Sequence, residues 1–480
     1  MHPRGSYPDD DFLHENLTFQ PIRQNFDEQD MAGMAQAVQE VFRDSNLCHR
    51  AALRTMGKLL MIAYHFPPQI GTSGLLRSLK FARYLPDEGW QPVVLTVKNW
   101  VYDRTDSSSN VPENIAVLRP FALDTRKHLS IGGRYIRWMA LPDRWVTWLL
   151  GAMPAGLTAI YRHHIDVIFS TFPIATAILI GLLLHRITGK PWVVDLRDSM
   201  TEDEYPKDPL TRKTYRWIET HAVRHADRIL FTAPSALDMY RNRYPFLNSA
   251  KCLVIPNGYD EEDFETLVSP RNMRIGNTPI RMVHSGLIYP EERDPRSFFR
   301  ALAALKKDSK IGPESLVVDL RATGNEGYFE RMIKDLQIDD IVRLLPALPY
   351  REALQDAADS QALLLLQAAS CNHQIPGKTY EYLRLGLPIL ALTPQEGDTA
   401  AVLREVGGAV IADLADEKAI YEALPAFLSE VRYGTHSLPD QEKAQCYERK
   451  NQTRLLACCL DQLVREKASA GSRMPPASRS

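Results

Sequence analysis

Short apolar runs that alternate with helix-length segments constrain the fold of this chain more than any other feature of its sequence. In the first half these runs are LLMIAY, PVVLTV, DVIFS, PWVVDL, DRILFT and CLVIP. Near-continuous apolar runs are typical of strands buried on both faces, and the intervening segments are long enough to form the helices that cover a parallel sheet. The pattern therefore predicts an α/β fold.

The series of strands and helices starts again after a polar linker. Asn257 and Gly258 form a turn-favouring pair, and the polar stretch SPRNMRIGNTP follows shortly afterwards. A second set of apolar runs then appears: IRMVHSG, LVVDLR, IVRLLP, ALLLLQ, LPILAL and GAVIA. Two doubly wound, Rossmann-like halves explain this repetition most simply. Because ligands of such sheets bind at the carboxyl ends of the strands, we expect the two halves to face a cleft.

These patterns divide the chain into six segments. We predict a largely disordered N-terminal extension at 1–57, a first Rossmann-like domain at 58–265, a linker at 266–278, a second Rossmann-like domain at 279–438, a terminal helix at 439–466 and a disordered tail at 467–480. The extension is polar and mildly acidic, and it contains the pattern of one short amphipathic helix after Asp30.

Charge and composition restrict the partners and the compartment. The chain has 57 Lys and Arg against 59 Asp and Glu, so its net charge of -2 gives no bulk signal for binding nucleic acid. The six cysteines show no CxxC pair and no zinc spacing, which suits a reducing compartment. We find no signal-peptide pattern, and the longest apolar run, IATAILIGLLL, is shorter than the ~20 residues that span a bilayer. We therefore expect a cytoplasmic protein.

One segment, GGRYIRWMALPDRWVTWLLGAM at residues 132–153, interleaves tryptophan with arginine. Tryptophan with arginine suits a membrane interface. It equally suits a loop that packs onto its domain, and Pro142 interrupts the helical pattern. Both interpretations stay open here. The first predicts a peripheral protein at the inner face of the membrane, and it favours a lipid-linked acceptor.

A loop in the second half has part of a phosphate-loop pattern. Gly377-Lys378-Thr379 ends the loop, and the strand-like run ALLLLQ precedes it. The loop of nucleoside triphosphatases needs a glycine where this chain has Asn372, and Pro376 removes one backbone donor. A lysine at a helix start can still meet a phosphate, because helix N-termini favour anions. The loop is therefore compatible with a nucleotide but differs from an ATP-binding loop.

Four motifs in this order resemble those of the retaining GT-B glycosyltransferases of the group 1/family 4 type. They are HFPPQIGTSG, DLRD, IPNGYD and PGKTYEYLRLGLPIL. The resemblance extends over roughly residues 58–465. It implies a GT-B fold, in which two Rossmann-like domains face a cleft, with the nucleotide-sugar donor on the C-terminal domain and the acceptor on the N-terminal one.

The resemblance also implies a set of donor-binding residues: Gly71, Gly74, Gly286, Arg293, Lys378 and Glu381. An arginine can fork onto a diphosphate, and Lys378 adds a mobile cation. Glu381 matches the glutamate that accepts the ribose hydroxyls, and hydrogen bonds to a charged acceptor contribute roughly 1.5–3 kcal/mol. The alternative is a surface ion pair between Lys378 and Glu381, which contributes under ~1 kcal/mol.

The chain departs from the family pattern at three places. Leu287 stands where an arginine is usual, and Arg293 lies one residue beyond the usual lysine, with Arg296 as a less suitable substitute. His373 stands eight positions before Glu381, where the family has its first glutamate. Some members with a similar loop also lack that glutamate.

Charged residues follow a buried strand in the first half, at Asp195, Arg197 and Asp198. Charges at this place are costly unless they pair with each other or face a cleft. A pairing between Arg197 and a carboxylate and a role in the cleft both stay open. The resemblance places these residues on the acceptor side, where Asp198 and Asp195 are the nearest candidates for a base.

The resemblance implies a metal-independent, retaining hexosyltransferase without a cofactor, acting in polysaccharide or glycoconjugate biosynthesis. It would move a sugar from a UDP- or GDP-linked donor to a glycan or lipid-linked acceptor. Negative charge develops on the leaving diphosphate, so Arg293 and Lys378 would supply the main catalytic contribution. Asp198, as a candidate base, is the third catalytic residue that the resemblance implies. Two alternatives remain: a nucleotide-sugar epimerase on the same fold, and a catalytically inactive scaffold, which Leu287 and His373 favour.

Overall fold

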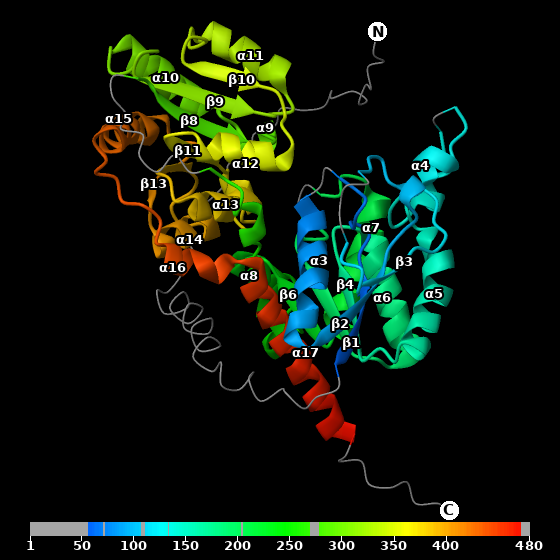
Figure 1. Cartoon of the computed structure of the whole chain (residues 1–480). Coiled ribbons are helices and arrows are strands. Elements are labelled where there is room, and N and C mark those ends of the chain that lie inside the picture. Colours follow the sequence, from blue (N-terminus) through cyan, green and yellow to red (C-terminus); the bar gives the residue numbers. More distant parts are fainter. Residues whose placement is uncertain are drawn as a thin grey trace, which may run out of the picture. The chain divides into compact units, whose positions relative to one another are not determined.

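The computed structural model describes residues 56–70, 73–106, 111–132, 134–202, 205–268 and 278–471, and it contains two parallel α/β sheets (Figure 1). Almost all of the predicted N-terminal extension, most of the predicted linker and Gly71 lie outside the described residues. The two sheets confirm the predicted fold class of two doubly wound domains.

Within the described residues, the first sheet contains seven strands, and every neighbouring pair is parallel. They are β1 (Gly57–Ile62), β2 (Trp90–Leu95), β3 (Ala116–Leu118), β4 (Val167–Thr171), β5 (Trp192–Leu196), β6 (Arg228–Phe231) and β7 (Cys252–Val254), in the order β3-β2-β1-β4-β5-β6-β7. The order reverses direction between β1 and β4, which is where doubly wound sheets bind their ligands.

Helices cover both faces of this sheet (Figure 1). They are α3 (Ser73–Tyr84), α4 (Thr125–His128), α5 (Trp148–Arg162), α6 (Ala175–Thr188), α7 (Pro209–His225) and α8 (Pro234–Arg243). The longest apolar run of the sequence forms α6, most of which is buried in the domain core. No helix among the described residues is both long and apolar enough to cross a membrane.

The second sheet contains six strands in the described part of the chain, again all parallel. They are β8 (Ile280–Ser285), β9 (Leu316–Arg321), β10 (Val342–Leu345), β11 (Ala362–Leu366), β12 (Ile389–Leu392) and β13 (Ala409–Ala412), in the order β10-β9-β8-β11-β12-β13. The helices of this domain are α9 (Pro290–Arg293), α10 (Arg296–Lys307), α11 (Glu326–Asp335), α12 (Tyr350–Ala358), α13 (Gly377–Leu385), α14 (Asp398–Val406) and α15 (Glu417–Tyr433).

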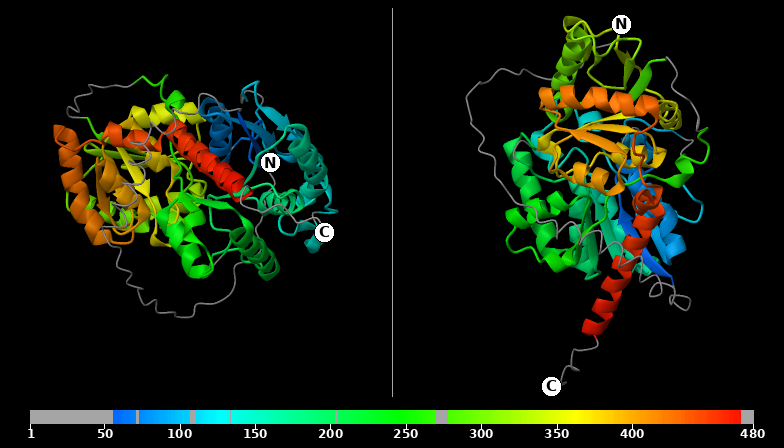
Figure 2. Two further views of the ribbon diagram at one scale, coloured as in Figure 1. Left: turned by 90° about the horizontal axis from the view of Figure 1, so that it is seen from below. Right: turned by 90° about the vertical axis from the view of Figure 1, so that its left-hand side faces the viewer.

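The chain then returns to the first domain. The helices α16 (Gln441–Ala444) and α17 (Arg449–Gly471) follow α15, and α17 runs beyond the predicted helix end at residue 466. Leu456, Leu460 and Leu463 join the apolar cluster formed by β1, β2 and α3 (Figure 2, red against blue). The Trp90 indole also donates to Asp461 at 3.1 Å. The α17 helix is therefore part of the first domain's core.

Short 3₁₀ helices connect several of these elements. They are η2 (Leu85–Glu88), η3 (Asn99–Val101), η4 (Arg137–Ala140), η5 (Ser249–Lys251), η6 (Glu261–Asp263), η7 (Ala369–Cys371) and η8 (Gln445–Tyr447).

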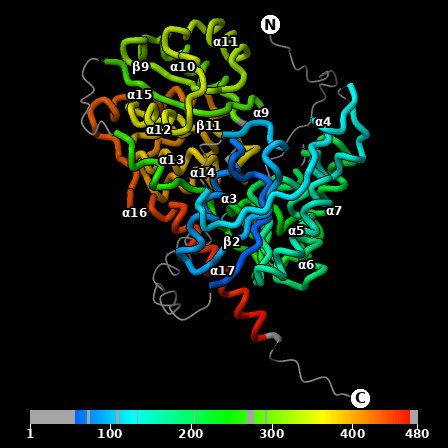
Figure 3. The backbone as a smooth tube through the Cα atoms, turned by 45° about the vertical axis from the view of Figure 1, so that its right-hand side comes forward, coloured from blue at the N-terminus to red at the C-terminus, as the bar shows by residue number. Residues whose placement is uncertain are grey.

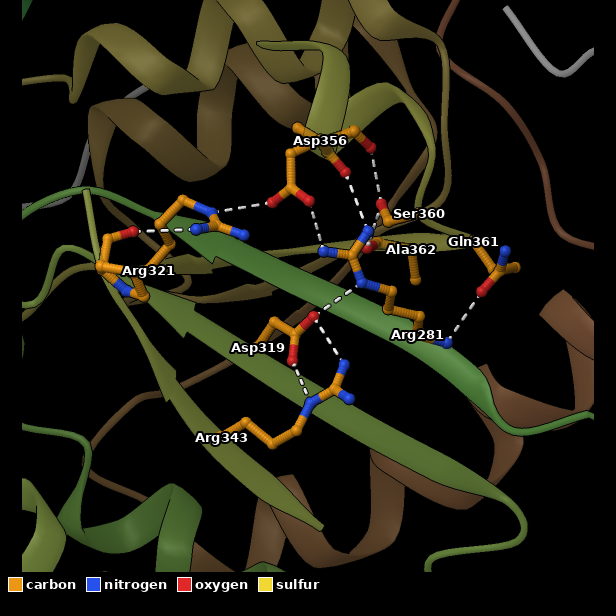
Figure 4. Close-up of polar contacts among 10 residues, drawn as sticks. Arg281, Asp319, Arg321, Arg343, Asp356, Ser360, Gln361 and Ala362 are labelled. Atoms are coloured by element: carbon orange, nitrogen blue, oxygen red, sulfur yellow. Dashed lines mark hydrogen bonds and ion pairs between the residues drawn. The ribbon is translucent and has the colours of Figure 1, made fainter. Parts of the chain in front are cut away.

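A network of alternating charges ties α12 to the second sheet (Figure 4). Asp319 of β9 is 0 % exposed and accepts from Arg281 at 2.6 Å and from Arg343 at 2.7 and 2.9 Å. Asp356 of α12 accepts from Arg281 at 2.6 Å and from Arg321 at 2.9 Å. Because Arg281 binds both carboxylates, the network fixes the position of α12 against β8 and β9.

We predict that Asp319→Ala lowers the free energy of unfolding by about 3–5 kcal/mol, because removing one partner of a buried ion pair leaves the other charges uncompensated. Urea denaturation measures this change. Asp340→Ala is the matched control: Asp340 also pairs with a cation, Lys306 at 2.7 Å, but it is exposed. Its loss is expected to cost under ~1 kcal/mol. Equal losses in the two variants would contradict a structural role for the network.

Candidate functional site

Lys378 and His284 meet at the carboxyl ends of β8 and β11. Lys378 lies in the first turn of α13, and its Nζ is 2.9 Å from Nε2 of His284. His284 is 0 % exposed, and its Nδ1 lies 2.9 Å from the carbonyl oxygen of Leu364. A carbonyl oxygen only accepts, so Nδ1 carries the imidazole proton and Nε2 accepts from Lys378.

Gly286 leaves room for this contact. Its φ of 125° lies in a region that favours glycine, and an added Cβ would stand 2.9 Å from Nζ of Lys378. The predicted site residues Gly286 and Lys378 are therefore neighbours.

Arg293 is the second cation of this site. Its Nη1 donates to the carbonyl oxygen of Leu287 at 3.1 Å, whereas its Nε is buried without a partner. Burial and, to a smaller extent, the charge of Arg293 lower the pKa of Lys378 to about 7, while Glu381 acts in the opposite direction. The two positive groups therefore repel each other and lack a matching pair of carboxylates.

Glu381 lies one turn after Lys378 on α13. Its Oε1 accepts from the Tyr350 hydroxyl at 2.8 Å, and burial raises the pKa of its carboxyl group. No ion pair links Lys378 to Glu381, although the structure describes both side chains. The alternative of a surface ion pair between them is therefore not realised.

On the first domain, Asp195 is bound within the protein. It accepts from Nε and Nη2 of Arg77 at 3.1 and 2.9 Å and from the Thr171 hydroxyl at 2.9 Å, and it is buried. The sequence left open a pairing between Arg197 and a carboxylate, but Asp195 is paired with Arg77 instead.

Arg197 and Gly74 lie against each other. Arg197 donates to the carbonyl oxygens of Phe172 at 2.7 Å and Gly74 at 2.6 Å. An added Cβ on Gly74 would stand 2.7 Å from Nη1 of Arg197, so glycine lets the loop approach the guanidinium. The first loop of the sequence and the residues after β5 therefore form one unit.

Asp198 differs from Asp195, because it forms no hydrogen bond or ion pair with any of the described residues. Burial raises the pKa of its carboxyl group, the charges of Arg197 and His373 lower it, and the charge of Glu202 raises it. His373, which stands at the position of the family's first glutamate, lies with Nε2 2.7 Å from Oε1 of Glu202. A carboxylate from the first domain is thus held beside the loop of the second.

Three residues with direct contacts in this site had no assigned role in the sequence. His284 belonged to a motif, but nothing in the pattern indicated that it bonds Lys378. Tyr350 and Glu202 come from an exposed helix start and an irregular loop, neither of which has a periodic signal. Within the described residues, no group of three His, Cys, Asp or Glu side chains is arranged to hold a metal ion.

The tryptophan–arginine segment divides into two parts. Trp148 is buried and Trp145 packs against the core, so the second part is a packed structural segment. The first part leaves Ile131, Ile136 and Trp138 exposed by 90, 56 and 69 %. We call the described residues 131–132 and 134–138 the exposed hairpin, because an antiparallel bridge joins Ile131 to Arg134. It follows α4 at the edge of the first domain (Figure 3, cyan).

Sequence comparison finds one family whose model matches part of this chain. Residues 76–258 match the model of the "Glycosyl transferase 4-like domain" family. No curated protein matches the chain by sequence.

Solved structures match over almost their whole length. Sucrose-phosphate synthase from Thermosynechococcus elongatus has 14% identity and a TM-score of 0.58, with 86% of this chain and 100% of that one covered. HepE from Anabaena, in complex with UDP and glucose, has 14% identity and a TM-score of 0.53, with 87% and 100% covered. Trehalose 6-phosphate synthase from Burkholderia multivorans has 11% identity and a TM-score of 0.58, with 88% and 99% covered.

Residues 76–258 thus resemble a glycosyl transferase 4-like domain, in agreement with the resemblance of the motifs, and the solved structures share the fold of this chain.

Proposed function

We propose that the protein is a glycosyltransferase that uses a nucleotide diphosphate sugar as its donor. The observation that carries the proposal is the uncompensated charge around Lys378. The charge of Arg293 acts on Lys378, and Glu381, the carboxylate that opposes this effect, is engaged by Tyr350. Lys378 itself lies in the first turn of α13, whose N-terminus also favours an anion. A diphosphate supplies the negative charge that this arrangement lacks.

The donor is expected to bind with its diphosphate between Arg293 and Lys378. Glu381 would accept the ribose hydroxyls, and Tyr350 would keep its carboxylate oriented toward them. Gly286, and Gly74 with its neighbour Gly71, would let the backbone approach the phosphates. We expect the nucleoside of the donor to be uridine or guanosine. HepE from Anabaena has been solved in complex with UDP-glucose, so a UDP-linked sugar is the first donor to test.

We propose that transfer proceeds with retention and without a cofactor or metal ion. The bond between the anomeric carbon and the diphosphate breaks, the acceptor oxygen bonds to that carbon, and the acceptor loses a proton. Arg293 and Lys378 would stabilise the negative charge on the leaving diphosphate. Of the two base candidates, Asp198 is favoured, because Asp195 is already bound by Arg77 and Thr171. Arg197 would help to shape the acceptor side together with these carboxylates.

The exposed hairpin supports a lipid-linked glycan as the acceptor. Exposed Ile and Trp side chains with Arg134 beside them suit the boundary between lipid headgroups and acyl chains. We therefore propose peripheral binding to an anionic membrane surface, in polysaccharide or glycoconjugate biosynthesis.

Nucleotide binding tests the donor site. We predict that UDP or GDP stabilises the wild-type protein by about 2.7 kcal/mol at a hundredfold excess over its dissociation constant, because it binds only the folded state. Lys378→Ala and Glu381→Ala should each weaken binding by roughly tenfold or more, since each removes a charged hydrogen-bonding group worth ~1.5–3 kcal/mol. Thermal unfolding with UDP, GDP, ADP and CDP gives the measurement.

Lys334→Ala is the matched control, because Lys334 is an exposed lysine on α11 that pairs only with Glu330. It should leave binding unchanged. If none of the nucleotides stabilises the protein, the proposed donor site is contradicted and an inactive scaffold is favoured. Conversion of the donor sugar to an epimer without an acceptor would instead indicate an epimerase.

Vesicle binding tests the exposed hairpin. We predict that the double variant Ile136→Ser/Trp138→Ser binds anionic phosphatidylglycerol vesicles at least about tenfold more weakly, because burial of one large apolar side chain contributes ~1.5–3 kcal/mol. Co-sedimentation measures the bound fraction. Tyr433→Ser, which removes an exposed aromatic side chain from α15, is the control and should bind like the wild type. Equal binding by the double variant would rule out this hairpin as the membrane contact.

A further inference from the structure

His284 is an unusual partner for a lysine. It is fully buried, its Nδ1–H is fixed on the Leu364 carbonyl, and only Nε2 is left for Lys378. An imidazolium would direct a second N–H at the ammonium group, so His284 stays neutral while Lys378 is charged. Burial and the charge of Lys378 accordingly lower the pKa of His284 well below its usual value.

The charged groups around Lys378 come from several elements. Arg293 on α9 opposes its positive charge, and Glu381 on α13 favours it. The carboxylate of Glu381 is itself influenced by Tyr350 on α12, by Asp263 and by Arg449. The net effect on Lys378 is that of a buried cation beside a second cation, with a neutral imidazole as its hydrogen-bond acceptor.

We propose that His284 is a positioning residue that makes this a proton-linked anion site, in which binding of a diphosphate is accompanied by uptake of a proton on Nζ of Lys378. The inference rests on the proposed function, because the anion is the diphosphate of the donor. His284 holds the amine at the place where the phosphate binds, and the amine takes up its proton from the solvent when the ligand binds.

The direction of the pH dependence follows from linkage. In the free protein the pKa of Lys378 is lowered to about 7, and a bound diphosphate raises it again through its negative charge. The complex therefore binds more protons than the free protein above neutral pH. Affinity is full below pH 7 and falls by about tenfold for each pH unit above it.

Calorimetry with UDP-glucose tests the inference, because both phosphates of this probe stay fully ionised over the range used. Titration in two buffers with different ionisation enthalpies gives the number of protons taken up. We expect the dissociation constant to rise about 30-fold from pH 6 to pH 8.5, with uptake of about 0.9 proton at pH 8. Lys378→Arg, whose guanidinium does not titrate, should bind with no proton uptake.

Variants of His284 separate positioning from folding. His284→Leu removes the acceptor, so the midpoint of the pH dependence should move to lower pH and binding at pH 6 should weaken by about tenfold. His284→Gln supplies a carboxamide oxygen and should recover most of both effects. Thermal unfolding without ligand checks that each variant is folded.

A dissociation constant of wild-type protein that is flat from pH 6 to pH 8.5 would overturn the inference and leave the donor site intact. Absence of binding by UDP-glucose and by GDP-mannose would instead count against the proposed function. In that case trace acetylation of Lys378, read by peptide mass spectrometry, decides the inference by itself. A midpoint near pH 7 that His284→Leu shifts supports it, whereas a midpoint near that of an ordinary lysine, about 10.4, overturns it.

Discussion

The candidate site depends on the parallel register of β8 with β11, in which Met282 faces Ala362 and Val283 faces Leu363. One step further along, the His284 imidazole bonds the Leu364 carbonyl, and the chain after each strand turns toward the same edge. Parallel strands end together, so segments about ninety residues apart place Gly286 and Lys378 side by side. A slip of this register by one residue would turn His284 to the other face of the sheet and remove the acceptor from Lys378.

The two domains handle their charges differently. On the first domain, Asp195 is bound by Arg77, and Arg197 is bound by backbone carbonyls, so these groups hold loops in place. On the second domain, Arg281, Asp319 and Asp356 are also mutually satisfied. The neighbourhood of Lys378 differs from these, because a neutral imidazole takes the place of a carboxylate there. A buried lysine beside a second cation and a neutral acceptor is a physical indication of an anionic ligand.

Much of the fold could be predicted from the sequence, because buried parallel strands are continuous apolar runs. The three-residue strand β3 was not predicted, since it is too short and too weakly apolar to give such a run. For the site, the resemblance of the motifs to a known family indicated which residues to consider but not their partners. The Glu202–His373 and Tyr350–Glu381 contacts join segments distant in sequence, and the division of the tryptophan segment between core and surface depends on tertiary packing. Local sequence patterns encode neither the contacts between distant segments nor the tertiary packing of the tryptophan segment.

The return of α17 to the first domain has a consequence for synthesis of the chain. The apolar face made by β1, β2 and α3 is completed by Leu456, Leu460 and Leu463, which leave the ribosome after the second domain. Domains of most proteins fold from the N-terminus as they emerge. Here the core of the first domain stays partly uncovered until the entire second domain has been translated. The α17 helix thus completes the core of a domain whose first strand begins about four hundred residues earlier.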